Sequence, residues 1–236
     1  MNAPLPTVRL KNAWNSTHPW IFQRLVDKPA TRPKPGSLVE VEQPDGTWMG
    51  RGFYNGHSRI AVRLLERDPE VAVDAAWFER RIGEAIALRR EVLDLDAVSD
   101  AWRVVHSEGD GLSGLVVDRY ADLVVVEFFS AGMFRHRDWI YDALRAHFPG
   151  CRIHASADEH VQKQESFDFR GSEPQAPALI TEHGVRFRAD PAGAHKTGFF
   201  ADQRENRQWL GQLCAGKRVL DLCCNTGGFG VYAAVR

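Results

Sequence analysis

The chain has 236 residues, of which 30 are Lys or Arg and 31 are Asp or Glu, and 44% of its residues are hydrophobic. These values are ordinary for a soluble globular protein, and no apolar run reaches the roughly 18 residues that a membrane-spanning helix needs. The N-terminus lacks the basic and apolar regions of a secretory signal, and the four cysteines form neither a C-x-x-C pair nor a disulfide framework, so a cytoplasmic protein with reduced thiols is expected.

The first 65 residues carry an excess of positive charge. They contain nine Lys or Arg residues and only four Asp or Glu residues. A basic module of this kind suits a phosphate-rich partner such as a nucleic acid. A solvated surface with a chance imbalance would give the same count, so charge alone does not decide between the two readings.

Residues 8–66 predict a small all-β module. Short runs of strand-forming residues are separated by turn residues at 33–36, 44–46 and 55–56. The alternation in 60–64 indicates a half-buried strand. The spacing of these runs is typical of a small barrel.

Residues 74–93 form the clearest predicted helix. Asp74 is a suitable N-cap. Apolar residues recur at helical spacing with charged residues between them, which predicts a helix that packs one face on a core and connects the barrel to the next domain. The apolar stripe consists of Phe78, Ile82, Ala85, Ile86, Val92 and Leu93.

Residues 102–190 predict a mixed α+β module. Its glycine-rich loop at 107–114 needs several residues with positive φ, and a helix is expected over 132–147 with Ile140, Leu144 and Phe148 on one stripe. The polar stretch 157–177 is expected to be a loop. Strands are expected at 102–106, 115–118, 123–129 and 152–155, and a β-hairpin at 178–181 and 185–188.

The C-terminal part contains a strand-turn-helix pattern. Val219 and Leu220 predict a buried parallel strand, and the paired glycines Gly227 and Gly228 open a helix after a tight turn. Such a turn offers free backbone N–H groups to a ligand, and the acidic Asp221 suits a ligand that carries an amine. The turn lacks the G-x-G-x-x-G spacing of nicotinamide-binding turns and the spacing of phosphate-cradling loops. An ordinary βα turn without a ligand is the alternative.

The segment 196–207 combines aromatic and polar residues. Phe199 and Phe200 are followed by Asp, Gln, Arg and Asn, a combination that suits a pocket for a flat adenine-like ring. The alternative is a helix N-terminus in which Asp202 is the cap and Arg204 and Arg207 face solvent.

The two C-terminal segments together resemble a known family. KTGFFADQRENR (196–207) followed by VLDLCCNTGGFG (219–230) is similar to the class I S-adenosylmethionine-dependent methyltransferases of large-subunit ribosomal RNA that modify cytosine at carbon 5 and carry an N-terminal PUA domain. HPWIF (18–22), GSLVEV (36–41) and GFYNGHSRIAVRLL (52–65) resemble that PUA domain, and EGDGLSGLVVDRY (108–120) resembles the central domain of the family. The resemblance covers the whole chain.

The resemblance implies a fold and a domain order. The expected architecture is a multidomain α+β and α/β protein with a PUA-like RNA-binding barrel at 1–68, a linking helix at 69–95, an α+β middle domain at 96–190, and the first βα unit of a Rossmann-like methyltransferase domain at 191–236. It also implies S-adenosylmethionine as cofactor and ribosomal RNA as partner, with no membrane and no metal; a homodimer is left open. The cofactor-binding residues that it implies are Lys196, Phe199, Phe200, Asp202, Gln203, Arg204, Asp221, Thr226, Gly227 and Gly228.

The resemblance further predicts that no catalytic residue lies in this chain. In the family, a cysteine thiolate adds to carbon 6 of the base, which makes carbon 5 nucleophilic. That cysteine, the acid that binds the ribose and the loop that holds the target base would follow Arg236, so the chain is expected to be a C-terminally truncated and inactive enzyme. Cys223 and Cys224 lie in the cofactor turn and are expected to be small buried residues instead.

Two other sets of residues have weaker functional interpretations. Glu108 and Asp110 could act as a general acid and base, but a structural turn whose carboxylates accept backbone N–H groups is preferred. The nine histidines show no metal-ligand spacing. Two other classes of function stay open: a non-catalytic RNA-binding protein built on the PUA and middle domains, and a fragment of a nucleotide-binding oxidoreductase, which the missing G-x-G-x-x-G spacing disfavours.

Overall fold

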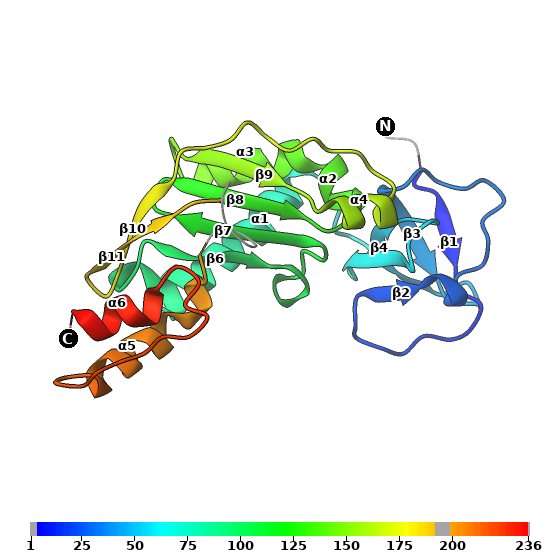
Figure 1. The fold of residues 1–236 in the computed structure, drawn as a ribbon. Coiled ribbons are helices and arrows are strands. Elements are labelled where there is room, and N and C mark those ends of the chain that lie inside the picture. Colours follow the sequence, from blue (N-terminus) through cyan, green and yellow to red (C-terminus); the bar gives the residue numbers. More distant parts are fainter. Residues whose placement is uncertain (1–3, 192–198, 236) are drawn as a thin grey trace.

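The computed structural model describes residues 4–191 and 199–235. Figure 1 shows a small β-barrel at one end of the molecule, two short C-terminal helices at the other end, and a four-stranded sheet with its covering helices between them.

The N-terminal barrel is a five-stranded sheet with the strand order β1-β3-β4-β5-β2. An isolated bridge between Leu10 and Val26 joins its two edges, so the sheet closes on itself as the sequence predicts. Val8, Ile21, Val39, Val41 and Val62 are fully buried inside it. The strands are β1 (Thr7–Arg9), β2 (Trp20–Phe22), β3 (Ser37–Glu42), β4 (Trp48–Tyr54) and β5 (Ile60–Glu66).

The prediction of a half-buried strand at 60–64 is wrong for one face of β5. Every residue of β5 after Ile60 is buried, including Arg63, which is 8% exposed. The reason is that β5 has the barrel core on one face and the middle domain on the other, and a contact between distant segments of the chain is not visible in a local pattern.

The helix α1 (Ala75–Ala87) begins where the sequence predicts. The carboxylate of Asp74 accepts a hydrogen bond from the backbone N–H of Trp77 at 3.0 Å, which is an N-cap. Phe78, Ile82, Ala85 and Ile86 are buried as expected, but Val92 and Leu93 are 72% and 54% exposed. The stripe ends early because a π-helical turn at Leu88–Val92 changes the helical period and rotates the last apolar residues away from the core.

The middle sheet has the order β6-β7-β8-β9 and is buried on both faces. In β8, Val124 and Val126 pack on the core beneath α1 and α3, whereas Leu123 and Val125 pack beneath the β10–β11 hairpin. This is the period-two alternation of a strand between two apolar layers. The elements are β6 (Ala101–His106), β7 (Leu115–Tyr120), β8 (Leu123–Phe128), β9 (Arg152–Ser156), α3 (Arg137–His147), β10 (Ala178–Glu182) and β11 (Val185–Ala189).

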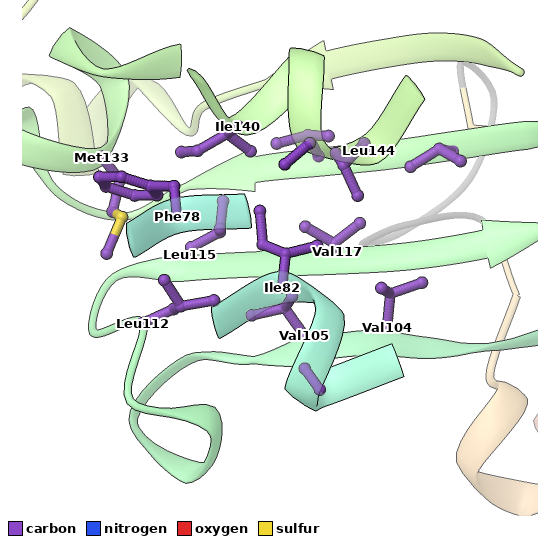
Figure 2. Close-up of a cluster of buried hydrophobic side chains, with 14 of the residues drawn as sticks. Phe78, Ile82, Val104, Val105, Leu112, Leu115, Val117, Met133, Ile140 and Leu144 are labelled. Atoms are coloured by element: carbon purple, nitrogen blue, oxygen red, sulfur yellow. The ribbon is translucent and has the colours of Figure 1, made fainter. Parts of the chain in front are cut away.

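The largest core lies between this sheet and the helices α1 and α3. Figure 2 shows Phe78 and Ile82 from α1 together with Ile140 and Leu144 from α3 and strand residues such as Val117. The same cluster includes Phe53 of the barrel strand β4. The barrel and the middle sheet therefore share one hydrophobic core.

Two further predictions of secondary structure need correction. The helix expected over 132–147 is interrupted at His136 and forms α2 (Ala131–Arg135) and α3, and the His136 ring stacks on Phe53 at 4.8 Å. The stretch 157–177 contains the short helix α4 (Glu159–Glu165), which is capped by the Asp158 carboxylate. Sequence polarity indicated a loop because α4 presents few apolar residues.

The parallel strand predicted at 219–220 does not form. Val219, Leu220 and Leu222 are 46%, 81% and 76% exposed, and no strand among the described residues pairs with this stretch. A parallel strand is stable only between neighbouring strands that bond its backbone and layers that cover its side chains. The helices on either side, α5 (Arg204–Leu213) and α6 (Gly228–Ala234), do form.

Candidate functional site

A buried ion pair fixes α5 to the β10–β11 hairpin. Arg207 of α5 donates two hydrogen bonds to the Glu182 carboxylate, at 2.8 and 2.6 Å, and the two residues are 3% and 0% exposed. A third Arg207 nitrogen donates to the backbone oxygen of Phe200 at 3.0 Å. A Cβ atom on Gly228 would lie 2.8 Å from Cδ of Arg207. Arg207 therefore contacts the hairpin, the backbone of Phe200 and the glycine turn, and the alternative in which it faces solvent is wrong.

Phe199 lies in the core. It is 5% exposed, its ring lies 5.2 Å from the ring of Phe187, and the Arg207 guanidinium lies 4.6 Å from its centroid. The Tyr120 hydroxyl donates to the Phe199 backbone oxygen at 2.9 Å, which fixes the segment to the middle sheet. Phe200, the next residue, is half-buried. Phe199 is thus a core residue, whereas Phe200 is partly exposed at the surface of the site.

The glycine turn begins α6. Gly227 has φ of 73°, a conformation that glycine adopts without strain, and no heavy atom lies within 4 Å of the position that a Cβ atom would take there. The Asp221 carboxylate accepts a hydrogen bond from the backbone N–H of Gly230 at 3.1 Å. Asp221 is thereby held beside the start of α6, as a carboxylate at a helix N-terminus should be.

The helix α6 is anchored on the hairpin through Tyr232. The Tyr232 hydroxyl donates to the backbone oxygen of Glu182 at 2.8 Å, and its ring stacks on Phe187 at 5.9 Å. The hairpin residue Glu182 thus contacts α5 through its side chain and α6 through its backbone. The turn is positioned by the hairpin in place of the missing strand.

The remaining predicted residues differ in exposure. Gln203 donates to the exposed Asp202 at 3.1 Å, whereas the Arg204 side chain is only 11% exposed and pairs with the exposed Glu205 at 2.8 Å, so Arg204 does not face solvent. Asp202 does not cap α5, whose N-cap Gln203 makes no side-chain cap hydrogen bond. Thr226 is exposed beside Gly227, and Lys196 lies outside the described residues.

The cysteines of the turn are not buried. Cys223 and Cys224 are both exposed, so the prediction that they pack beneath the turn is wrong. They are exposed because the preceding stretch, 219–222, forms no strand that would pack them against a core. Among the described residues, no group of three or more His, Cys, Asp or Glu side chains is arranged to hold a metal ion.

The paired acids of the glycine-rich loop hold the loop in place. Asp110 pairs with Arg89 and accepts from the His106 backbone N–H, and Glu108 accepts from Trp20 Nε1 at 2.8 Å and from Ser113 Oγ at 2.6 Å. The loop has positive φ at Ser107, Gly111 and Gly114, as the sequence predicts. A structural role fits Asp110, whereas Glu108 faces the barrel.

Sequence reasoning missed Arg63 and Arg207. Both are buried arginines with carboxylate partners far away in the sequence: Glu165 for Arg63 and Glu182 for Arg207. An arginine inside an otherwise apolar strand, as in 60–65, is a usable signal, because such a residue needs a buried partner. No comparable signal marks Arg207.

Comparison with known protein families divides the chain into two matched regions. Residues 9–67 match the model of a PUA-like domain, and residues 151–236 match the model of the S-adenosylmethionine-dependent methyltransferases. Within the described residues, no helix is both long and apolar enough to cross a membrane.

Curated relatives carry a shared name. The chain is 40% identical over 222 residues to ribosomal RNA large subunit methyltransferase I of Aeromonas hydrophila and 37% identical over 223 residues to the protein of the same name from Shewanella denitrificans. Each match covers 92% of this chain and 56% of the relative. The chain thus spans little more than half the length of these relatives. The resemblance to large-subunit rRNA methyltransferases with a PUA-like domain is confirmed. The names of the relatives do not state which atom is methylated, so modification at carbon 5 of cytosine stays a prediction.

Two solved structures share the fold. A protein from Streptococcus mutans assigned to the S-adenosylmethionine-dependent methyltransferases matches with a TM-score of 0.72 at 20% identity. A second methyltransferase structure, solved in complex with SAH, matches with a TM-score of 0.74 at 22% identity. Each match covers 98% of this chain and 60% of the solved chain.

Proposed function

We propose that this chain forms the RNA-binding and cofactor-binding parts of a cytoplasmic S-adenosylmethionine-dependent methyltransferase that modifies carbon 5 of a cytosine in large-subunit ribosomal RNA. The observation that carries the proposal is the Arg207 cluster, which joins the aromatic-polar segment and the glycine turn at one place in a region that matches the methyltransferase model. The names of the relatives support ribosomal RNA as the substrate.

The glycine turn fits the cofactor in two respects. Open space lies beside Gly227, so a ligand can approach the backbone there. The Asp221 carboxylate, half-buried and fixed by its bond to the Gly230 N–H, offers a negative charge for the ammonium group of the amino-acid part. Phe199 does not fit the predicted role, because it is enclosed in the core.

The residues of the chain then have separate tasks. Asp221 binds the amine, Thr226 supplies a backbone N–H group, Gly227 leaves room for the ligand, and Phe200 and Gln203 contribute to the surface that the adenine ring contacts. Arg207 touches no ligand but keeps the turn and the aromatic-polar segment in register. The bound cofactor supplies the methyl group that is transferred to the base.

The barrel provides affinity for RNA. Its surplus of basic residues attracts phosphates, which fixes the orientation of the RNA without reading its sequence. The RNA-binding barrel thus lies at one end of the molecule in Figure 1, and the cofactor turn lies at the other end.

Calorimetric titration with S-adenosylmethionine tests the cofactor assignment. The chain should bind the cofactor, and Asp221→Asn should weaken binding about 10- to 100-fold, which is the value of one hydrogen bond to a charged group. Asp142→Asn is the matched control, because Asp142 lies on α3 and pairs only with the exposed Arg145. Equal affinities for the wild type and D221N would refute the role of Asp221.

A second candidate function is RNA binding without catalysis. The observation that favours it is the exposure of Val219, Leu220 and Leu222 in the stretch that should support the cofactor turn. Salt-dependent binding of ribosomal RNA with no measurable cofactor binding would select this function over the first.

A further inference from the structure

A cavity lies between the barrel and the middle domain, away from the cofactor turn. Its volume is about 660 Å³, within the range of ligand-binding pockets. The lining comes from the barrel strands β2 and β5, the glycine-rich loop, and α4. The contacts described above give this cavity no role in binding the cofactor.

Aromatic rings line the cavity. Trp20 and Phe22 alternate with the buried Ile21 along β2, so both rings point out of the barrel, and their centroids lie 6.5 Å apart in an edge-to-face arrangement. Phe129 lines the cavity from the end of β8. Phe22 and Phe129 are each 37% exposed, which is unusual for side chains that a core could have covered. Exposed rings in a concave site are stacking surfaces for flat ligands.

Charged groups of both signs line the cavity, with Arg59 and Arg63 balancing Glu108 and Glu165. The Arg63 guanidinium lies 3.6 Å from the Glu108 carboxylate, 3.3 Å from the Glu165 carboxylate and 5.5 Å from the Trp20 ring. The Glu165 carboxylate is already bonded to Ser58, Asn55 and Arg63, so the Glu108 carboxylate is the acceptor that a ligand N–H group would meet. Burial raises the pKa of Glu108, but hydrogen bonds from Ser113, Ser107 and Trp20 outweigh it and bring the pKa below its ordinary value, so Glu108 is ionised at neutral pH.

Arg63 also retains an unused hydrogen-bond donor. The residue is 8% exposed and lines the cavity, yet its buried Nε has no hydrogen-bond partner in the described part of the chain. An unpaired buried donor is costly, and native structures usually satisfy such a group with a protein partner, water or a ligand.

Positive charge also lies at the rim of the cavity. Arg59 lines both this cavity and an adjoining one of about 350 Å³, which Arg24 and Phe22 also line. Arg24 and Arg59 are exposed, and neither makes an ion pair with a described residue. A ligand with a flat ring bearing N–H donors and an attached phosphate would match the carboxylate-lined cavity and its cationic rim together.

We propose that this cavity binds one unstacked nucleotide of the RNA, with its base between the aromatic rings and its flanking phosphates on Arg24 and Arg59. The inference rests on the proposed function, because it assigns the RNA binding of the barrel to a specific cavity. A base with an exocyclic amine suits the Glu108 carboxylate. Since β2, β5 and α4, which line the cavity, lie away from α5 and α6 on the other side of the middle sheet in Figure 1, this nucleotide anchors the RNA and is not the one that is methylated.

Filter binding with unmodified large-subunit ribosomal RNA transcribed in vitro tests the proposal. Phe22→Ala should weaken binding about 5- to 150-fold, the range that one base–aromatic stack contributes. Arg24→Ala and Arg59→Ala should each reduce the slope of log affinity against log salt by about one. Cofactor affinity should not change in any of the three.

Matched controls lie at the other end of the molecule. Trp209→Ala removes a ring that is 65% exposed on α5, and Arg186→Ala removes an exposed arginine on β11. Both should leave RNA affinity unchanged. Ultraviolet cross-linking should attach RNA to the peptide that contains Trp20 and Phe22, and cytidine monophosphate should compete only at concentrations far above those of RNA.

The outcomes distinguish a failure of the cavity proposal from a failure of the proposed function. RNA binding that F22A, R24A and R59A leave intact, with no cross-link near Trp20, overturns the cavity assignment while the proposed function stands. Competition by the mononucleotide at the concentration of RNA also overturns it, because the cavity would then be a small-molecule site. No RNA binding by the wild type overturns both proposals.

Discussion

At the scale of single residues, the Arg207–Glu182 pair decides whether the C-terminal segments hold together. Both side chains are almost fully buried, and removing one partner of such a pair leaves the other as an uncompensated charge. The loss is therefore larger than the net stability that the intact pair provides.

Arg207→Ala should lower the stability of the C-terminal region by about 3–5 kcal/mol, the usual cost of breaking a buried pair. Circular dichroism during thermal unfolding measures the effect, and cofactor affinity should fall with it. Arg186→Ala serves as the control, since Arg186 lies exposed on the same hairpin. A melting profile of R207A that overlays that of R186A would contradict the central position given to this residue.

Glu108 predicts a dependence of stability on pH. Its pKa is lowered in the folded protein, so its contribution to stability is fully present above the unfolded pKa near 4.5 and disappears as the pH falls through the lower folded pKa. Glu108→Gln should therefore lower the melting temperature at pH 7, and this deficit should shrink as the pH falls below 4.5 and through the lower folded pKa. A deficit of E108Q that is the same at pH 7 and pH 3.5 would show that the ionised carboxylate is not what stabilises the loop.

At the scale of elements, the approach of α2 to the barrel strand β4 depends on a glycine. A Cβ atom on Gly132 would lie 2.1 Å from Cγ of Phe53, inside van der Waals contact, so Phe53 or α2 must move. Gly132→Ala should cost about 1–3 kcal/mol, as overpacking does. Gly109→Ala is the control, because its nearest contact would be 3.4 Å from His106. Chemical denaturation compares the two, and equal midpoints would contradict the packing.

The stretch 216–226 should exchange its backbone amides rapidly. It forms no strand, and its leucines are exposed, so few backbone hydrogen bonds protect it. Hydrogen exchange followed by mass spectrometry should show fast exchange there and slow exchange in β7 and β8. Strong protection at 219–222 would mean that the predicted strand forms in solution.

Local patterns predicted the elements whose partners lie nearby in the sequence. The Asp74 cap, the 178–189 hairpin and the positive-φ loop at 107–114 need only short-range information. The predictions that were wrong depend on contacts between distant segments, which a local sequence pattern does not contain. Arg63 and Arg207 owe their burial to Glu165 and Glu182, which lie far away in the sequence, and Val219 is exposed because no strand among the described residues pairs with it.

The candidate site was predictable to a similar degree. The sequence identified the glycine turn and Asp221, because strand-turn-helix patterns with acidic residues carry a recognisable chemistry. It did not separate the buried Phe199 from the half-buried Phe200, since two adjacent aromatic residues look alike until the core behind them is known.

At the scale of the whole molecule, the barrel and the middle domain are joined by their core. Phe53 and Leu65 of the barrel pack in the same cluster as Phe78 and Ile140, and Glu165 of α4 pairs with the barrel residue Arg63. These segments should unfold in one cooperative transition. Calorimetry and tryptophan fluorescence should give the same midpoint; a separate, earlier transition of the barrel would contradict a shared core.

The glycine turn and the segment at Phe200 should form a single cofactor site. Nuclear magnetic resonance of the ¹⁵N-labelled chain titrated with SAH tests it directly. The backbone amides of Gly227, Gly228, Gly230, Asp221 and Phe200 should shift together and saturate at one ligand concentration, while those of the barrel stay in place. Shifts confined to the barrel, or separate saturation of the turn and of Phe200, would contradict it.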